Sequence, residues 1–344
     1  MIGTFLYIDS LPWRMLSRNH QTKLENIPPS PANHVDAPAP EINPAAAADY
    51  DNRGLLKAQK GDLDGAILDY NQALDLDPTL AVAYSNRGDA KYAGGNPDGA
   101  IADYTQAVTL DPKLALAYCH RGSVRQAKGD ADGATLDYDQ ALALDPKIAT
   151  AYYNRGLLKE QKGDLDGAIA DSTQAIDLDP KDAQAYCNRG LARLGRDDLD
   201  EAMSDLKTFC QLAPKDPDAD DARLYIWLIS KEENPGAKAD EELAASLQTD
   251  WNSTPEGLES RIAGFVLGHV KEDDLIAAAA SPDPGQEPGR ICKARYFIGM
   301  KRLLAGDKAN AADQFRQCLA TGARDHCEYI FARAELRALG QSQP

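Results

Sequence analysis

The sequence has little positive charge. Its 344 residues include 37 lysines and arginines against 54 aspartates and glutamates, for a formal net charge of −17. A surface this negative repels phosphate groups, so we expect no nucleic-acid partner, and anionic membrane surfaces are disfavoured for the same reason.

Long apolar runs are also missing. The longest in the body of the chain is Ile262–Leu267, far short of the roughly 20 residues that a membrane-spanning helix needs. Near the N-terminus a short run, Phe5–Ile8, is interrupted by Asp9 and follows no basic residue, and the first cysteine is Cys119. We therefore expect no signal peptide, lipid-attachment site or transmembrane helix. The protein is then cytoplasmic or, if the start codon is mis-called, periplasmic or in the cell envelope.

Residues for catalysis are scarce. The chain has five histidines and no glycine-rich phosphate loop, metal-ligand spacing or nucleophile elbow. His269 is expected on an apolar helix, at its core or edge. His326 and Cys327 are neighbours, and neighbours on a helix point about 100° apart. We predict a protein that is not an enzyme, with no catalytic residues, no metal site, no cofactor and no small-molecule substrate.

The six cysteines are scattered without a CxxC pair. We interpret them as buried or free thiols, since cysteine behaves as a small apolar residue. One disulfide within the group Cys292, Cys318 and Cys327 is the alternative, with the pairing left open.

The sequence does contain a repeat. GDLDGAILDYNQALDLDP at 61–78 and GDLDGAIADSTQAIDLDP at 163–180 share 14 of 18 residues and begin 102 residues apart, which is three times 34. At this period NRG or HRG recurs at 52–54, 86–88, 120–122, 154–156 and 188–190, and proline recurs at 78, 112, 146, 180 and 214. Five copies therefore run from about Ala47 to Pro214.

Each copy predicts two helices. In the first copy they are Ala47 to about Lys60 and Asp62 to about Leu76. Gly61 and Asp62 suit a helix end followed by an N-cap, and the Asp-Pro pair ends the second helix.

This pattern resembles the tetratricopeptide repeat (TPR) family. With Ala47 as repeat position 1, the first copy has Tyr50 and Tyr70 at the family's aromatic positions 4 and 24. It has Gly54 at the glycine position 8, Ala66 and Ala73 at the alanine positions 20 and 27, and Pro78 at the proline position 32. The resemblance implies an all-α fold, an α-solenoid in which helix hairpins form a right-handed superhelix. The fourth copy departs with Ser172 at position 24, which predicts a looser joint there. The layout as a whole is more loosely similar to bacterial envelope adaptor lipoproteins of the NlpI type.

Four regions are expected. Residues 1–46 are an N-terminal segment with a flexible Pro/Ala-rich linker. Residues 47–214 hold the five repeats, numbered 47–80, 81–114, 115–148, 149–182 and 183–216. Residues 217–289 form an irregular helical region that ends in a loop, 281–290. Residues 290–344 form a sixth TPR-like hairpin and a capping helix, Cys327–Leu339.

The resemblance implies that the first helices line a concave groove with positions 2, 5, 9, 12 and 13. In a chain this acidic the groove is apolar, which suits an extended peptide or an amphipathic helix from a protein partner. Asparagines at position 6 offer a donor and an acceptor that could hold a peptide backbone. The candidate partner-binding residues are Asn52, Leu55, Val82, Asn86, Tyr92, Leu116, Tyr153, Asn154, Leu157, Asn188 and Leu191.

We therefore predict a protein–protein interaction adaptor, with a bacterial cell-envelope role as one setting. The alternative is a self-assembling structural solenoid, a homo-oligomer whose groove is filled by its own C-terminal helices. The family's clamp for C-terminal carboxylates is missing, because positions 5 and 9 lack its lysine and asparagine.

Arginines at position 7 and bases at position 11 form a stripe. These bases either bind anions along the stripe or form ion pairs with the aspartates at position 23. We favour pairing, because both series share one period, and exposed pairs would contribute about 0.2–1 kcal/mol each.

Overall fold

The computed structural model describes residues 44–216, 218–234, 238–247, 257–280, 285–324 and 326–341. Within these ranges all regular structure is helical. The helices form antiparallel hairpins that stack as in an α-solenoid, which confirms the predicted fold class. No helix in the described ranges is long and apolar enough to cross a membrane. The expected linker before residue 44 lies outside the described residues.

Ten helices come from the repeated part of the chain, two for each copy. Their bounds are α1 Pro44–Gln59, α2 Leu63–Leu76, α3 Ala81–Ala93, α4 Pro97–Leu110, α5 Ala115–Ala127, α6 Ala131–Leu144, α7 Ala149–Gln161, α8 Leu165–Leu178, α9 Ala183–Leu194 and α10 Leu199–Leu212. The odd-numbered helices are the first helices of their copies, as the period predicts.

Seven further helices follow in the described part of the chain. They are α11 Ala219–Glu233, α12 Ala239–Leu247, α13 Leu258–Val266, α14 Glu272–Ala279, α15 Glu287–Leu304, α16 Lys308–Ala320 and α17 Cys327–Ala338. The loop expected at 281–290 is wrong at its end, because α15 already begins at Glu287. Pro288 lies in the first turn of α15, where its missing N–H has no helical partner to lose, so proline there starts a helix.

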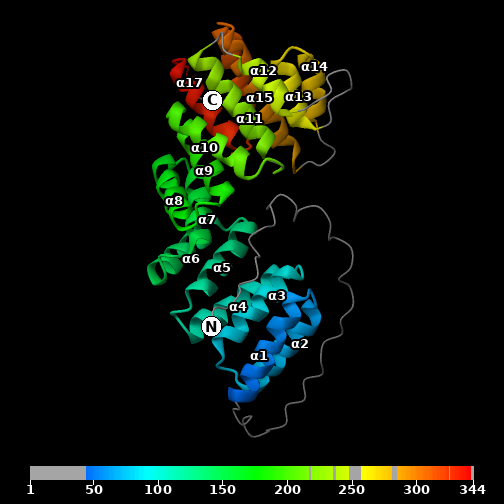
Figure 1. The fold of residues 1–344 in the computed structure, drawn as a ribbon, viewed down its shortest axis with the longest axis vertical. Coiled ribbons are helices and arrows are strands. Elements are labelled where there is room, and N and C mark those ends of the chain that lie inside the picture. The colour runs from blue at the N-terminus through cyan, green and yellow to red at the C-terminus, as the bar shows by residue number, and fades with distance from the viewer. Residues whose placement is uncertain are drawn as a thin grey trace. The chain divides into compact units, whose positions relative to one another are not determined.

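The chain divides into two compact units, residues 1–155 and 156–344. The boundary falls inside α7, in the fourth copy. The predicted division into five repeats, an irregular region and a sixth hairpin stays a prediction, as does the looser joint at the fourth copy. Figure 1 shows the hairpins α1–α2, α3–α4 and α5–α6 of the first unit, from blue to green.

The turn inside each of the first four hairpins follows from its Gly-Asp or Gly-Asn pair, whereas the fifth has Asp197 at the glycine position, with a φ of 69°. Gly61 has a φ of 80°, a left-handed conformation that costs glycine little. The next residue, Asp62, accepts a hydrogen bond from the backbone N–H of Gly65 at 3.0 Å and so caps α2. The chain reverses here by local chemistry alone.

Close helix approach within a hairpin depends on glycine at position 8. A Cβ placed on Gly88 would lie 2.8 Å from the ring of Tyr104, inside van der Waals contact. Tyr104 is 1% exposed and packs with Ala100 and Val124, so its ring joins one hairpin to the next. In the fourth copy the partner is Ser172, and a Cβ on Gly156 would meet nothing closer than 3.4 Å.

An aspartate of each second helix is buried between two bases of the first helix. Arg87 donates to both carboxylate oxygens of Asp103, at 2.8 and 2.7 Å, and Lys91 Nζ lies 2.7 Å from Asp103 Oδ2. Asp103 is only 4% exposed. The other copies also bury the aspartate at position 23 and pair it with the base at position 11, at Asp69, Asp137, Asp171 and Asp205. In the fourth copy Arg155 pairs with Asp139. Pairing is confirmed, but the expectation of exposed pairs is wrong.

In the first copy the two bases more than offset the cost of burying the carboxylate. In the first copy the hydrogen bond from Arg53 lowers the pKa of Asp69 to about 2, against the opposing effect of burial. The carboxylate therefore stays charged between its two bases at every physiological pH, and it ties α1 to α2.

The same arginines also reach the preceding copy. Arg87 Nη1 donates to Asn71 Oδ1 at 2.7 Å, and Arg121 Nη1 donates to Thr105 Oγ1 at 3.2 Å. Each guanidinium also lies near the ring of the tyrosine three residues earlier, at 5.3 Å for Arg87 and Tyr84. One arginine thus holds its own hairpin and orients the hairpin on its neighbour.

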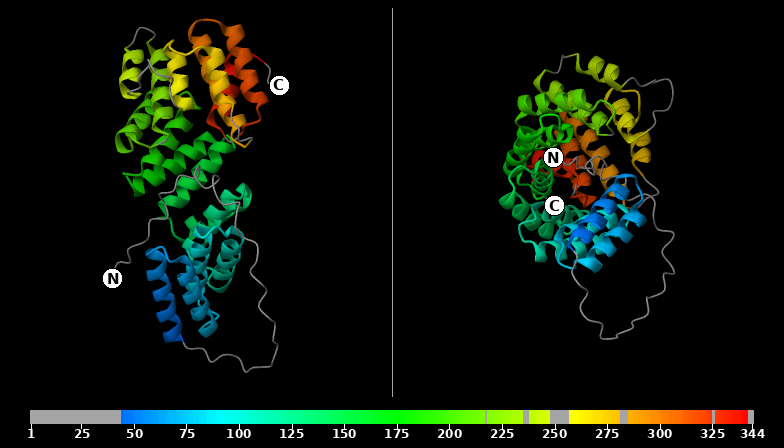
Figure 2. Two further views of the ribbon diagram at one scale, coloured as in Figure 1. Left: turned by 90° about the vertical axis from the view of Figure 1, so that its right-hand side faces the viewer. Right: turned by 60° about the horizontal axis from the view of Figure 1, so that its bottom comes forward.

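The second unit has an aromatic core that the repeated part lacks. Tyr225 of α11 lies 5.6 Å from Phe297 of α15 and 5.7 Å from Phe331 of α17, between ring centroids. Tyr296 packs against Phe297, Phe315 and Phe331. Figure 2 shows α15, α16 and α17 side by side, in orange and red. These rings hold the irregular helices and the sixth hairpin in one core.

A disulfide joins Cys292 of α15 to Cys318 of α16. The alternative of one disulfide is therefore confirmed in this group, and Cys327 is a free thiol, as are Cys119, Cys187 and Cys210. Counted from Gly299 at position 8, the two paired cysteines occupy positions 1 and 27, where four of the five copies have two alanines. The register brings these positions together, which is why cysteine at both forms a bond.

We expect Gly88→Ala to destabilise the protein by about 1–3 kcal/mol, because the new methyl group overlaps the Tyr104 ring. Gly156→Ala is the matched change at the same repeat position. It should be neutral or stabilise by roughly 0.5–1 kcal/mol, because alanine is the better helix former and space is available. Urea unfolding followed by circular dichroism compares the two, and equal midpoints would contradict this packing.

Asp103→Asn should destabilise the protein by about 2 kcal/mol, since it leaves Arg87 and Lys91 without their shared carboxylate. Asp98→Asn is the control, because Asp98 pairs with Lys128 while its side chain is 80% exposed, and it should cost less than about 1 kcal/mol. Thermal unfolding in low salt measures both. A loss at Asp103 no larger than at Asp98 would show that burial adds nothing to the pair.

Candidate protein-interaction surface

The candidate residues of the first unit lie on its first helices, at positions set by the hairpin packing. Once Gly88 and its equivalents face the second helix, positions 2, 5, 9 and 12 point elsewhere. Leu55 and Val82 are 38% and 45% exposed, and Tyr92, Leu116 and Tyr153 are half-buried. The first unit therefore presents apolar side chains from four successive first helices.

The asparagines at position 6 mostly serve the stacking of the first helices. Asn86 Nδ2 donates to Asp51 Oδ1 at 3.0 Å, and Asn154 Nδ2 donates to Ser123 Oγ at 3.3 Å. Each bond runs to the preceding copy. These bonds use the Nδ2 of Asn86 and Asn154 for contacts between copies, and the interpretation of the amides as a ladder for a peptide backbone stays a prediction.

The other position-6 residues are His120, Asn188 and Asn52, and they differ in their contacts and exposure. His120 takes the place of asparagine in the third copy, and its Nδ1 lies 2.8 Å from Asp89 Oδ1 of the second copy. Asn188 is 8% exposed, so its amide lies below the surface. Only Asn52, in the first copy, is exposed. The acceptors differ from copy to copy, with Asp51 at position 5 and Asp89 and Ser123 at position 9, so the period of the sequence did not indicate these bonds.

In the second unit the C-terminal helices cover the inner face of the fifth copy. Leu191 and Leu194 of α9 pack against the core that contains α11, α15 and α17. A side chain on Gly195, after α9, would meet the Phe331 ring of α17 at 3.3 Å. Leu157 of the fourth copy is half-buried. Leu191 is therefore partly buried against this core, and its place among the candidate partner-binding residues stays a prediction.

A buried polar cluster lies within this covered region. Lys293 Nζ lies 2.6 Å from Asp221 Oδ2 and 3.3 Å from Glu259 Oε1, and Tyr225 donates to Glu328 Oε1 at 2.7 Å. Burial would lower the pKa of Lys293, but the charges of Asp221, Glu328 and Glu259 outweigh it and raise that pKa. The contacts join α11, α13, α15 and α17.

Sequence reasoning missed this cluster, although one indication was present. Lys293 occupies position 2 of the sixth hairpin, an inner-face position, between cysteine and alanine. A charge at that position has to find buried partners. Which acidic residues supply them depends on the irregular helices, whose register no repeat predicts.

The candidate catalytic residues Cys327, His326 and His269 lie in different surroundings. Burial raises the pKa of the Cys327 thiol well above its usual value, which disfavours the reactive thiolate. His326 Nδ1 lies 3.9 Å from Glu328 Oε2. His269 follows the end of α13 and is exposed, so its expected place on an apolar helix is wrong. The described residues contain no group of three or more His, Cys, Asp or Glu that could hold a metal ion.

Sequence profiles described as TPR repeat match residues 54–95, 88–129, 123–163 and 160–195, and one described as tetratricopeptide repeat matches 183–216. The crystal structure of MamA is 33% identical over 47% of this chain and 95% of its own, with a TM-score of 0.43. PilW, described as a widely conserved type IV pilus biogenesis factor, is 20% identical over 61% of this chain and 96% of its own, with a TM-score of 0.51. YrrB, described as a TPR protein with an unusual peptide-binding site, is 22% identical over 52% and 92%, with a TM-score of 0.45.

Glu160 of α7 offers a test of how tightly the inner face is covered. Burial, aided by the charge of Glu328, raises the pKa of Glu160 to about 7 from an unfolded value near 4.5. The folded protein then binds the extra proton between these values, so this group's contribution to stability falls as pH rises from 4.5 to 7. We expect Glu160→Gln to gain roughly 3 kcal/mol relative to wild type between pH 4 and pH 8.

Urea unfolding at both pH values measures this change. Glu201→Gln, on an exposed site of α10, controls for the loss of one carboxylate. If the difference between Glu160→Gln and wild type is the same at pH 4 and pH 8, Glu160 is not buried against α17 as described.

Proposed function

Because this chain belongs to the tetratricopeptide repeat family, we propose that it is a protein-interaction scaffold that holds a partner segment on the first helices of its first unit. Stacked repeats of this kind build extended surfaces in which each hairpin supplies one strip. The proposed surface consists of Asn52, Leu55, Val82, Tyr92, Leu116 and Tyr153.

One observation carries the proposal. Position 9 is leucine in the first, fourth and fifth copies, at Leu55, Leu157 and Leu191. In the fifth copy Leu191 packs against the C-terminal core, whereas in the first copy Leu55 is 38% exposed. The chain thus covers this apolar position where its own helices reach it and leaves the same position open at the other end.

The chemistry of the surface favours an amphipathic helix or an extended apolar segment. Leu55, Val82 and Leu116 recur on successive first helices, so a partner lying across them meets one apolar side chain from each hairpin. The polar groups beside them are already bonded, as Asn86 is to Asp51. Binding would then depend mainly on apolar burial, at about 25 cal/mol per Å².

We further propose a bacterial cell-envelope setting for this adaptor. The Cys292–Cys318 disulfide supports it, because disulfides persist in oxidising compartments and are rare in the cytosol. The loose similarity of the layout to NlpI-type adaptors points the same way. Fractionation of the native organism, with thiol labelling before and after reduction, would test both the compartment and the bond.

We expect the double substitution Leu55→Glu and Val82→Glu to abolish partner capture, because two buried carboxylates in an apolar contact cost several kcal/mol. Both side chains are exposed in the free protein, so folding should be preserved. The measurement is a crosslinking pull-down from the native organism with the wild-type and variant chains, followed by mass spectrometry of the captured proteins.

Leu136→Glu is the matched control, since Leu136 is 69% exposed on the second helix α6, and it should leave capture unchanged. Retention of every partner by the double variant would refute the proposed surface. If the double variant instead changes the oligomeric state measured by sedimentation, the surface serves self-assembly, and the structural alternative replaces the adaptor.

A further inference from the structure

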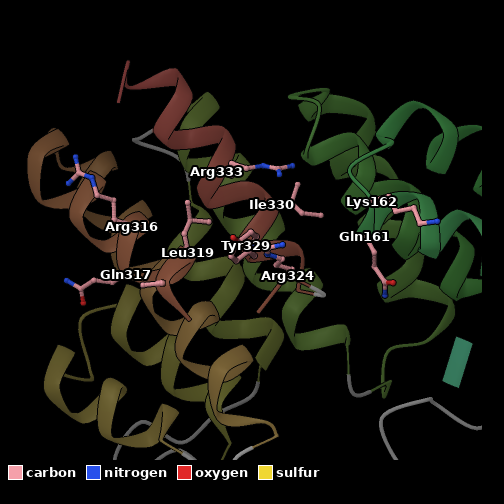
Figure 3. Close-up of a pocket in the computed structure, with 10 residues that line it drawn as sticks. Gln161, Lys162, Arg316, Gln317, Leu319, Arg324, Tyr329, Ile330 and Arg333 are labelled. Carbon is pink, nitrogen blue, oxygen red and sulfur yellow. The ribbon is translucent and has the colours of Figure 1, made fainter. Parts of the chain in front are cut away.

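A basic cavity lies within the second unit, whereas the apolar surface proposed above belongs to the first. It has a volume of about 870 Å³, within the roughly 300–1,000 Å³ of clefts that hold small ligands or peptide side chains. The end of α7 forms one wall, and α16, α17 and the turn between them form the other. Figure 3 shows Ile330 and Arg333 of α17 directed across the opening toward Gln161 and Lys162.

The rim of this cavity has the opposite charge to the rest of the protein. Four bases line it, and none of the lining residues in the described part of the chain is acidic; the bases are Lys162, Arg316, Arg324 and Arg333. The chain as a whole carries a net charge of −17. A concentration of guanidinium groups is therefore the exception here, and low-dielectric walls increase its local potential.

The three arginines of the cavity differ from those of the repeats in their ion pairing. Arg53, Arg87, Arg121 and Arg189 are all ion-paired with a buried aspartate. Among the described residues, Arg316, Arg324 and Arg333 have no carboxylate within ion-pair distance, and Arg316 donates only to the amide Gln341 Oε1, at 2.7 Å. Their charge is available to a ligand.

The floor of the cavity is apolar. Leu319 and Ile330 are 8% and 9% exposed, and Ala320 and Tyr329 lie beside them. A ligand that fits both parts needs carboxylates for the arginines and an apolar side chain for the floor.

We propose that this cavity binds an acidic peptide segment of a partner protein, with carboxylates held by Arg316, Arg324 and Arg333 and one apolar side chain packed on Leu319 and Ile330.

Other occupants fit less well. A lone inorganic anion would leave most of the volume and the apolar floor unused. A nucleic acid would satisfy the arginines, but the chain's net charge of −17 would repel its phosphate backbone. A peptide can enter with only a few residues, and guanidinium forks match carboxylates with paired hydrogen bonds.

The test uses the full chain and a fluorescein-labelled peptide of alternating glutamate and leucine, followed by fluorescence anisotropy. We expect binding that weakens as salt is added. The double substitution Arg324→Gln and Arg333→Gln should weaken it at least tenfold. Lys60→Gln with Lys308→Gln removes the same charge from exposed sites outside the cavity and should change the affinity less than twofold.

Two further peptides test the basic and the apolar part of the cavity one at a time. Replacing glutamate by glutamine should abolish binding, and replacing leucine by serine should weaken it at least fivefold. Leu55→Glu with Val82→Glu should leave peptide affinity unchanged, because the cavity is independent of the surface on the first unit. The two proposals can therefore fail separately.

Four results would overturn the proposal. The double arginine variant could bind as tightly as wild type, or the lysine control could lose as much affinity as it does. Inorganic phosphate or a DNA oligonucleotide could compete as well as the unlabelled peptide, which would make this a general anion site. The arginine variant alone could change the sedimentation coefficient of the protein, which would make the occupant a second copy of this chain.

Discussion

The buried aspartate of each second helix is the contact on which the repeated part of this protein depends. Its carboxylate is shared by an arginine and a second base of the first helix, as Asp103 is by Arg87 and Lys91. The same arginine reaches back to the preceding hairpin. A buried carboxylate that loses a partner is costly, so the two helices keep one relative rotation. That rotation directs glycine 8 toward the second helix and the variable positions toward the inner face.

Polar groups at position 6 extend this arrangement across the inner face. Asn86 and Asn154 bond to the copy before them, so the amides that looked suited to a ligand stabilise the stack. Among the candidate positions of the first unit, those that are exposed are Asn52 and the apolar Leu55 and Val82. The recurring residues thus build the frame, and the residues that differ between copies form the surface that a partner would meet.

The C-terminal helices change the same scaffold in the second unit. They pack against Leu191, the charge of Glu328 in α17 acts on buried Glu160, and they balance Lys293 with carboxylates from three helices. The cavity beside α17 then collects arginines that have no carboxylate of their own among the described residues. The fifth copy is packed against the C-terminal helices. The cavity beside α17 is basic, whereas the protein as a whole is acidic.

The sequence alone determined the period of 34, the five pairs of helices with the Gly-Asp or Gly-Asn turns of the first four, and the class of fold, because turns, caps and helix faces depend on residues close in the chain. It also indicated the pairing of arginine with aspartate, since both recur in one register. Only the tertiary structure decided that Asp103 is buried, that Leu191 is covered while Leu55 is open, and that Arg316, Arg324 and Arg333 surround one cavity. These facts depend on helices far apart in the sequence, and the irregular helices that bring them together follow no repeat from which their positions could be calculated.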